Sequence, residues 1–117
     1  MTIIHLDYDL IHELASLLEE EFPVLVNTFI ENSNHLLEKM STLLAEGDIK
    51  IFIMNIHSFK GSCKNLGAEH LADLCMNYET LANQGQIERI DSEFKEIRAE
   101  LDKVSELLRH YMNSASN

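Results

Sequence analysis

The sequence of 117 residues is long enough for one domain of ordinary size and too short for two. Hydrophobic residues make up 45% of it and charged residues 25%, close to the average for globular proteins, which argues against disorder throughout. Nine Lys and Arg against twenty Asp and Glu give a net charge of −11 at pH 7, which nucleic-acid phosphates and anionic membranes would repel.

Helical periodicity predicts five helices in chain order. They span about residues 8–20, 23–45, 49–66, 68–83 and 87–111. Gly47 is typical of a helix stop, and Asp48 of the N-cap that begins the third helix. The last segment has the clearest amphipathic pattern, in which apolar residues recur at alternating steps of three and four. These residues are Ile87, Ile90, Phe94, Ile97, Leu101, Val104, Leu108 and Tyr111.

Short loops between long helices favour antiparallel neighbours. We therefore expect an all-α fold, an up-down-up-down antiparallel four-helix bundle with an additional short N-terminal helix. The domain is expected over residues 1–112, followed by a disordered polar tail over residues 113–117. The long helices can bury their apolar stripes against one another, which predicts a monomer.

Targeting and metal signals are missing from the sequence. No apolar run approaches the ~20 residues of a membrane span, and the N-terminus lacks the basic start of a signal peptide. Cys63 and Cys75 are too few for a disulfide framework, and no Cys/His cluster has the spacing of a metal site. We expect a cytoplasmic protein without a metal, a nucleic-acid partner or a membrane partner.

The third helix carries the strongest functional signal. On a helical wheel, His57 points away from the core face, together with Lys60, Gly61 and Lys64. The core face consists of Phe52, Ile56, Phe59, Cys63 and Leu66. A histidine in a structural role would be expected on the other side of this helix.

The charge around His57 is unusual for so acidic a chain. Residues 49–68 contain no Asp or Glu, whereas Lys50, Lys60 and Lys64 give this stretch a charge of +3. The rest of the chain holds six basic and twenty acidic side chains, a net charge of −14. Two of the lysines share the histidine's face, which indicates a small anion site. The alternative to an anion site is that the lysines have this spacing by chance, on a face that contacts only solvent.

Gly61 lies one turn after His57 on the same face. A glycine inside a helix costs about 1 kcal/mol relative to alanine, so its presence needs a reason. One reason is room above the imidazole for a phosphoryl group or a protein surface. The other is a close contact between helices, which the wheel position opposite the core disfavours.

These residues resemble the histidine-containing phosphotransfer (HPt) domain family. The segment 56–68, IHSFKGSCKNLGA, is similar to the family signature His-x-x-Lys-Gly-Ser followed by Leu-Gly-Ala. Gly47-Asp48 ahead of this helix and Tyr78-Glu79 on the next also match the family pattern, over about residues 22–85. The sequence departs from it at Phe59 and Cys63, where Leu and Ser or Ala are commoner; both lie on the expected core face.

The resemblance implies a stand-alone bacterial HPt protein of a two-component phosphorelay. His57 would accept a phosphoryl group from the receiver aspartyl phosphate of a hybrid sensor kinase and pass it to the receiver domain of a response regulator. Glu79, by position, would accept the proton of the other ring nitrogen, and Lys60 and Lys64 would offset phosphate charge. No cofactor is implied, since Mg²⁺ is expected in the partner receiver domain.

Partner contacts are expected around the histidine, at Ile53, Met54 and Ser58 as well as at Lys60, Gly61 and Lys64. Ile53 and Met54 lie one turn before His57. They would form the apolar part of a receiver-docking patch, or they would be covered by a neighbouring helix.

Three other functions compete with the relay. A catalytically inert HPt-like scaffold would bind receivers or kinases without carrying phosphate, but His57, Lys60 and Gly61 are intact. A di-iron bundle needs Glu-x-x-His twice, and the sequence has none. A histidine kinase needs an ATP-binding domain, which four glycines in a bundle cannot supply. A phosphoryl carrier without ATP-dependent kinase activity of its own is therefore expected.

Overall fold

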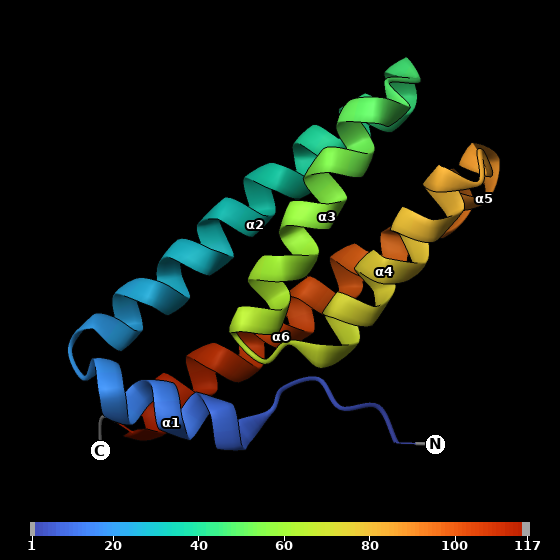
Figure 1. Cartoon of the computed structure of the whole chain (residues 1–117). Coiled ribbons are helices and arrows are strands. Elements are labelled where there is room, and N and C mark those ends of the chain that lie inside the picture. Colours follow the sequence, from blue (N-terminus) through green and yellow to red (C-terminus); the bar gives the residue numbers. More distant parts are fainter. Residues whose placement is uncertain (1, 116–117) are drawn as a thin grey trace.

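The computed structural model describes residues 2–115, and all of its regular structure is helical (Figure 1). The helices are α1 (Tyr8–Leu18), α2 (Glu21–Glu46), α3 (Ile49–Asn65), α4 (Glu69–Asn83), α5 (Ile87–Glu93) and α6 (Lys95–Ala115). The sequence prediction of an all-α chain is therefore confirmed. None of the described helices is both long enough and apolar enough to cross a membrane.

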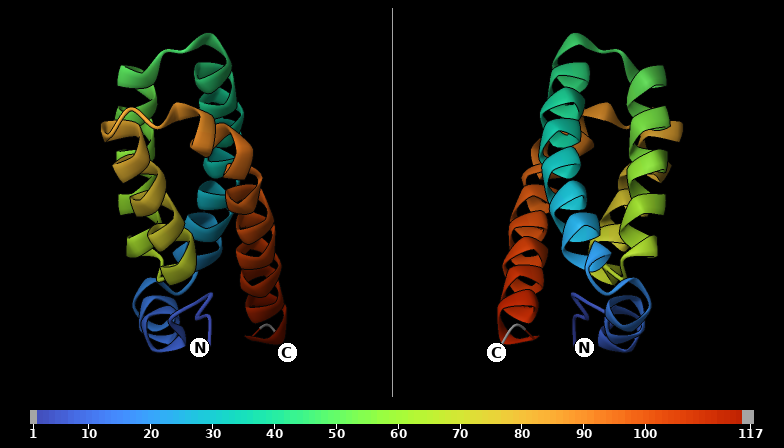
Figure 2. Two further views of the ribbon diagram at one scale, coloured as in Figure 1. Left: turned by 90° about the vertical axis from the view of Figure 1, so that its right-hand side faces the viewer. Right: turned by 90° about the vertical axis from the view of Figure 1, so that its left-hand side faces the viewer.

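The long helices α2, α3, α4 and α6 enclose the core. Contacts run from α2 to α3, from α3 to α4, from α4 to α6 and from α6 back to α2. Figure 2 shows α1 lying at one end of these helices, near both chain termini. The largest fully buried side chains come from all of these elements, among them Ile11, Met40, Phe52, Phe59, Leu71 and Leu101.

The N-terminal segment before α1 holds the turn between α3 and α4. Asp7 N–H donates to the carbonyl of Gly67 at 2.8 Å, and His70 N–H donates to the carbonyl of Ile4 at 3.2 Å. Gly67 has a φ of 74°, and an added Cβ would lie 3.1 Å from the Asp7 Cβ. Only glycine is comfortable in that conformation and at that distance. The N-terminal segment thus holds the end of α3 and the start of α4 in place.

Gly47 ends α2 as the sequence predicts, with a φ of 74° and its N–H directed at the carbonyls of Leu43 and Leu44. This left-handed residue is a common helix stop. Asp48 occupies the N-cap position of α3, although its side chain makes no capping hydrogen bond.

The prediction of one helix over residues 87–111 is wrong, because the chain breaks at Phe94 into α5 and α6. Tyr78 on α4 donates its hydroxyl to the carbonyl of Glu93 at 2.6 Å. Ile97 N–H instead donates to the carbonyl of Phe94 at 3.1 Å, a tighter turn than the α-helical one. The hydroxyl of Tyr78, from another helix, thus takes the Glu93 carbonyl to which Ile97 N–H would donate in a continuous helix.

The disordered tail predicted over residues 113–117 differs from the structure. Helix α6 continues to Ala115, so residues 113–115, which we expected to be disordered, are helical. Met112 still packs against the core, one residue past the predicted end of the helix at Tyr111. Residues 116–117 of the expected tail lie outside the described residues.

Replacing Tyr78 by Phe should lower the free energy of unfolding by about 1–2 kcal/mol, because the partly buried Glu93 carbonyl loses its donor while the ring still packs. Urea denaturation measures this change. Tyr111→Phe is the control, since that hydroxyl meets His12 at an exposed position and its loss should cost less than about 0.5 kcal/mol. Equal stability of Tyr78→Phe and the parent would contradict the account of the break at Phe94.

Candidate functional site

Helix α3 is oriented as its sequence pattern predicts. Its buried residues are Phe52, Ile56, Phe59 and Cys63. His57 lies on the opposite side with 66% of its side chain exposed, next to exposed Ser58, Gly61 and Lys64. The two departures from the family pattern, Phe59 and Cys63, are both core residues, and the Phe59 ring stacks on Phe29 with 6.4 Å between centroids.

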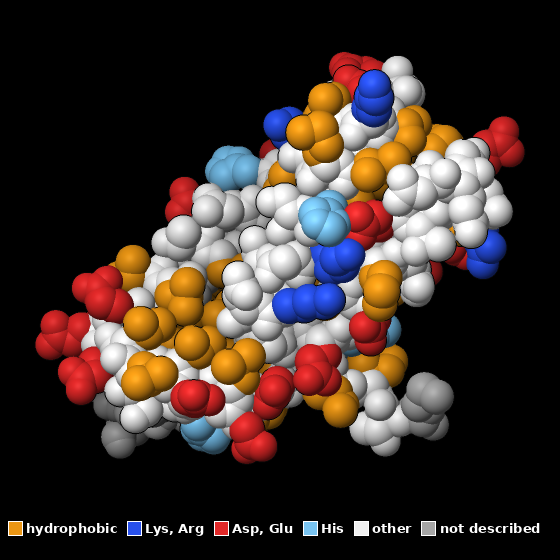
Figure 3. Space-filling model, viewed as in Figure 1, with side chains coloured by type: hydrophobic (Ala, Val, Ile, Leu, Met, Phe, Trp, Pro, Cys, Tyr) orange, Lys and Arg blue, Asp and Glu red, His pale blue; other side chains and the backbone are white. Residues whose placement is uncertain are grey.

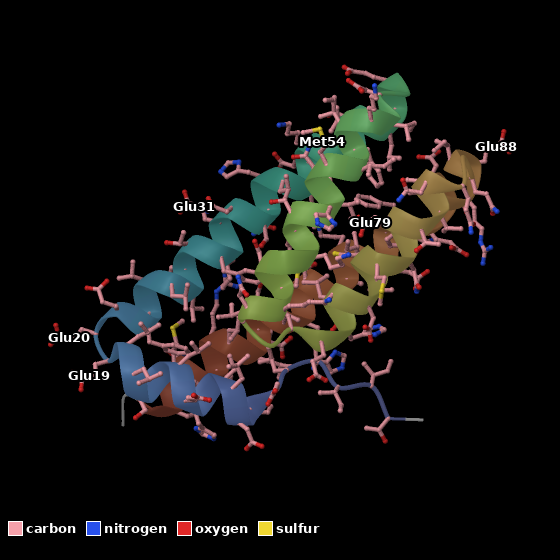
Figure 4. The ribbon with its side chains drawn as sticks, viewed as in Figure 1. Glu19, Glu20, Glu31, Met54, Glu79 and Glu88 are labelled. Carbon is pink, nitrogen blue, oxygen red and sulfur yellow. The ribbon has the colours of Figure 1, made fainter. Side chains whose placement is uncertain are left out.

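Glu79 on α4 joins two residues of the α3 site. Its Oε2 lies 2.7 Å from Nδ1 of His57, and its Oε1 accepts from Nζ of Lys60 at 2.7 Å. The Glu79 and Lys60 side chains are 16% and 17% exposed, so this bridge is much more sheltered than the imidazole. Figure 4 shows Glu79 between the two helices.

The bridge determines where the imidazole proton lies. The hydrogen bond from Lys60 lowers the pKa of Glu79 most, the bond from His57 adds to this effect, and partial burial opposes both. Glu79 is therefore ionised at neutral pH, and an ionised carboxylate only accepts hydrogen bonds. His57 must carry its proton on Nδ1, so Nε2 of the neutral ring keeps a free lone pair.

The lowered pKa of Glu79 makes a pH-dependent contribution to stability. Because the folded-state pKa lies below the ordinary value of 4.5, the ionised carboxylate stabilises the fold fully above pH 4.5. That contribution is lost as the pH falls through the folded-state pKa. The stability difference between the parent and Glu79→Gln, measured by urea denaturation, should be largest at pH 6 and should shrink toward pH 3. A constant difference over that range would contradict the ionised bridge.

Lys60 and Lys64 have different surroundings, which the sequence pattern alone does not distinguish. Lys60 is engaged by Glu79, so its charge already has a partner in the protein. Lys64 is exposed in the last turn of α3. Lys60, which is expected to offset phosphate charge, is thus also part of the hydrogen-bonded bridge. An ammonium group has three donors, and the bond to Glu79 uses one.

Gly61 faces open space. A Cβ added at this position would meet no other heavy atom within 4 Å among the described residues. The alternative that Gly61 permits a close contact between helices is therefore excluded. The absence of a side chain leaves the surface beside His57 low and open.

Apolar side chains are exposed on both helices that form the site. Met54 is 66% exposed, and Ile53 is partly buried against the core. On α4, Met76 is 44% exposed, three residues before Glu79, a position that sequence analysis did not select. The i,i+3 spacing from Glu79 is the signal that identifies it. Figure 3 shows the basic side chains beside a histidine on this face, with hydrophobic side chains near them.

No cluster of three or more His, Cys, Asp or Glu suited to a metal ion occurs within residues 2–115. Helix α3 itself has no carboxylate. The candidate site consists of one exposed imidazole, two ammonium groups and one carboxylate that is hydrogen-bonded to the ring.

Comparisons with known proteins agree with this geometry. The family model described as the Hpt domain matches residues 24–107. The structure is similar to that of histidine-containing phosphotransfer protein B (HptB) from Pseudomonas aeruginosa PAO1, with a TM-score of 0.90 and 30% identity, covering 97% of this chain and 98% of that chain. A rice protein provisionally assigned as a histidine-containing phosphotransfer protein has the same fold, with a TM-score of 0.65 and 16% identity over 91% of this chain and 83% of that chain. The search of curated proteins gives no match.

Proposed function

The chain belongs to the Hpt domain family, and we propose that it carries a phosphoryl group on Nε2 of His57 within a two-component phosphorelay. The observation that carries this proposal is the exposed imidazole whose Nδ1 is bonded to Glu79, because this bond leaves Nε2 as the nucleophile. The phosphoryl donor is the aspartyl phosphate of a hybrid sensor kinase's receiver domain. The acceptor is the aspartate of a response regulator's receiver domain.

In the proposed transfer, the lone pair of Nε2 attacks the phosphorus of the aspartyl phosphate. The N–P bond forms as the bond between phosphorus and the carboxylate oxygen breaks, and the aspartate leaves with that electron pair. The ring keeps its Nδ1 proton and becomes positively charged, so the carboxylate of Glu79 at 2.7 Å stabilises it. Transfer to the next receiver is the reverse reaction on a new aspartate.

The lysines have separate parts in this proposal. Lys60 compensates the charge of Glu79 and has further donors for the phosphoryl oxygens. Exposed Lys64 lies one turn beyond Lys60, and its attraction for the phosphoryl group is screened by salt. Because α3 contributes no carboxylate, the Mg²⁺ of the reaction belongs to the receiver.

The receiver would dock over the low surface at Gly61, with contacts to Ser58, Met54 and Met76 and a smaller one to Ile53. Methionine side chains are flexible and polarisable, so they adapt to more than one partner surface. We also propose that α2, α3, α4 and α6 form an up-down-up-down antiparallel four-helix bundle with α1 as the additional N-terminal helix. In this arrangement the protein acts as a cytoplasmic monomer, and one receiver at a time reaches His57.

A transfer assay tests the proposed function. Receiver domains of hybrid kinases from the same genome, labelled with ³²P on aspartate, are mixed with the protein. At least one of them should transfer label to this chain, in a form that is labile to acid and stable to base. Binding of receivers without any label on the chain would identify a catalytically inert scaffold instead.

Replacing Gly61 by Gln should slow the transfer by about 10- to 100-fold, because the side chain would keep the receiver's phosphoryl group away from its reactive position. The free energy of unfolding should meanwhile rise by roughly 0.5–1 kcal/mol from helix propensity. Rapid-quench kinetics measures the rate, and Gly61→Ala is the control, with a similar gain in stability and little loss of rate. If Gly61→Gln transfers as fast as the parent, the receiver docks elsewhere.

A further inference from the structure

The N-terminal segment, residues 2–7, completes the start of α4. The first N–H groups of any helix find no acceptor within it. Ala68, at the N-cap position of α4, makes no capping hydrogen bond through its side chain. Instead, His70 N–H in the first turn donates to the carbonyl of Ile4 at 3.2 Å, from the segment that runs past the α3–α4 turn (Figure 1). The helix that carries Glu79 is thus capped by a part of the chain that is distant in sequence.

One side chain of this segment is anchored on α6. His5 follows Ile4 directly, and its Nδ1 lies 2.7 Å from Oε2 of Glu100. The Glu100 side chain is only 8% exposed, and within residues 2–115 the imidazole is the one partner of its carboxyl group. A carboxyl group so sheltered is destabilising unless it is hydrogen-bonded, so Glu100 favours conformations in which His5 reaches it.

The His5 ring also contacts α4 directly. Its centroid lies 6.3 Å from that of the His70 ring, with 83° between the ring planes, an edge-to-face arrangement. Next along the segment, Leu6 is buried in the core, and Asp7 N–H bonds to the Gly67 carbonyl. His5 therefore lies between α6 and the first turn of α4, next to the residue whose carbonyl caps that turn.

We propose that His5 is a positioning residue for His57, an inference that rests on the proposed function. Bonded to Glu100, His5 holds the Ile4 carbonyl against the first turn of α4. Glu79 lies two to three turns further along the same helix, so its place beside His57 depends on how firmly α4 is held. A loosened α4 shifts Glu79 relative to the imidazole, and a shift of about 1 Å in an orienting group is enough to slow a reaction.

Three measurements on His5→Ala test this inference. Exchange of the His70 amide hydrogen should become at least about ten-fold faster, because the N–H loses its fixed acceptor. The ¹⁵N spectrum of the His57 ring should show less of the Nδ1–H tautomer, because Glu79 is less often in place. Transfer of ³²P from a phosphorylated receiver should slow about three- to ten-fold. A purely structural role of His5 would not change the tautomer of a ring in another part of the molecule.

Glu100→Met repeats the test without leaving a buried carboxyl group unpaired. Methionine has a similar volume and no polar group that needs a partner, so the variant should stay folded, as circular dichroism would show. His5 loses its anchor in this variant as well. The changes at the His70 amide and the His57 ring should therefore match those of His5→Ala.

Two controls accompany these variants. His5→Gln should restore most of the parent behaviour, since its amide can donate to Glu100 in place of the imidazole. His12→Ala removes a different histidine, whose exposed hydrogen bond to Tyr111 lies outside the N-terminal segment, and it should leave all three measurements unchanged.

A folded His5→Ala or Glu100→Met protein with the parent tautomer at His57 would overturn the inference, as would equal changes in His12→Ala. The exchange and tautomer measurements use no phosphoryl donor. A parent chain that takes up no label therefore contradicts the proposed function, while the two spectroscopic measurements still decide whether His5 positions the His57 ring.

Discussion

His57→Gln should abolish phosphorylation of the chain without unfolding it. The imidazole supplies the proposed nucleophile, and the amide of glutamine has no nitrogen lone pair available for attack at phosphorus. The side chain is 66% exposed and lies opposite the buried face of α3, so its replacement leaves the core intact. Label from any phosphorylated receiver should fall below detection, while helicity and the midpoint of urea unfolding stay near the parent values.

The matched control is His35→Gln, the same substitution at an exposed histidine of α2. This variant should be labelled like the parent. Mass spectrometry of the labelled parent at neutral to basic pH should place the phosphoryl group on the peptide that contains His57. Label on His57→Gln, or a modified peptide with a different histidine, would show that the assignment of the phosphoacceptor is wrong.

Glu79→Ala should slow phosphotransfer by about 10- to 100-fold, because the His57 ring loses the acceptor that holds its tautomer and orientation. The positive charge that develops on the ring also loses its nearest carboxylate. In addition, the ammonium of Lys60, only 17% exposed, is left without its partner. Glu79→Gln should have an intermediate rate, since an amide oxygen can still accept from Nδ1–H but carries no charge.

The ¹⁵N spectrum of the His57 ring distinguishes this positioning role from a structural one. In the parent, the neutral ring should show the Nδ1–H tautomer, whereas Glu79→Ala should show a mixture dominated by the Nε2–H form. A stability effect by itself would not move this signal. A parent-like tautomer in Glu79→Ala, together with a parent-like rate, would remove Glu79 from the mechanism.

The sequence by itself determined the helical class and the orientation of α3. Residues at steps of three and four place Phe52, Ile56 and Phe59 on one side of a helix and His57 on the other. That inference needs only the helix period, because neighbours on a helix are set by local geometry. The open surface at Gly61 followed from the same wheel.

Contacts between residues distant in sequence were decided only by the tertiary structure. The prediction at Glu79 depended on family resemblance, and the second bond of its carboxylate, to Lys60, was not anticipated. The amphipathic pattern over residues 87–111 is continuous, yet the chain breaks at Phe94 because Tyr78 takes the carbonyl of Glu93.

A pattern along one helix states which side is buried. It does not state which side chain of another helix will reach a given carbonyl, carboxylate or hydroxyl, since that depends on the relative placement of the packed helices.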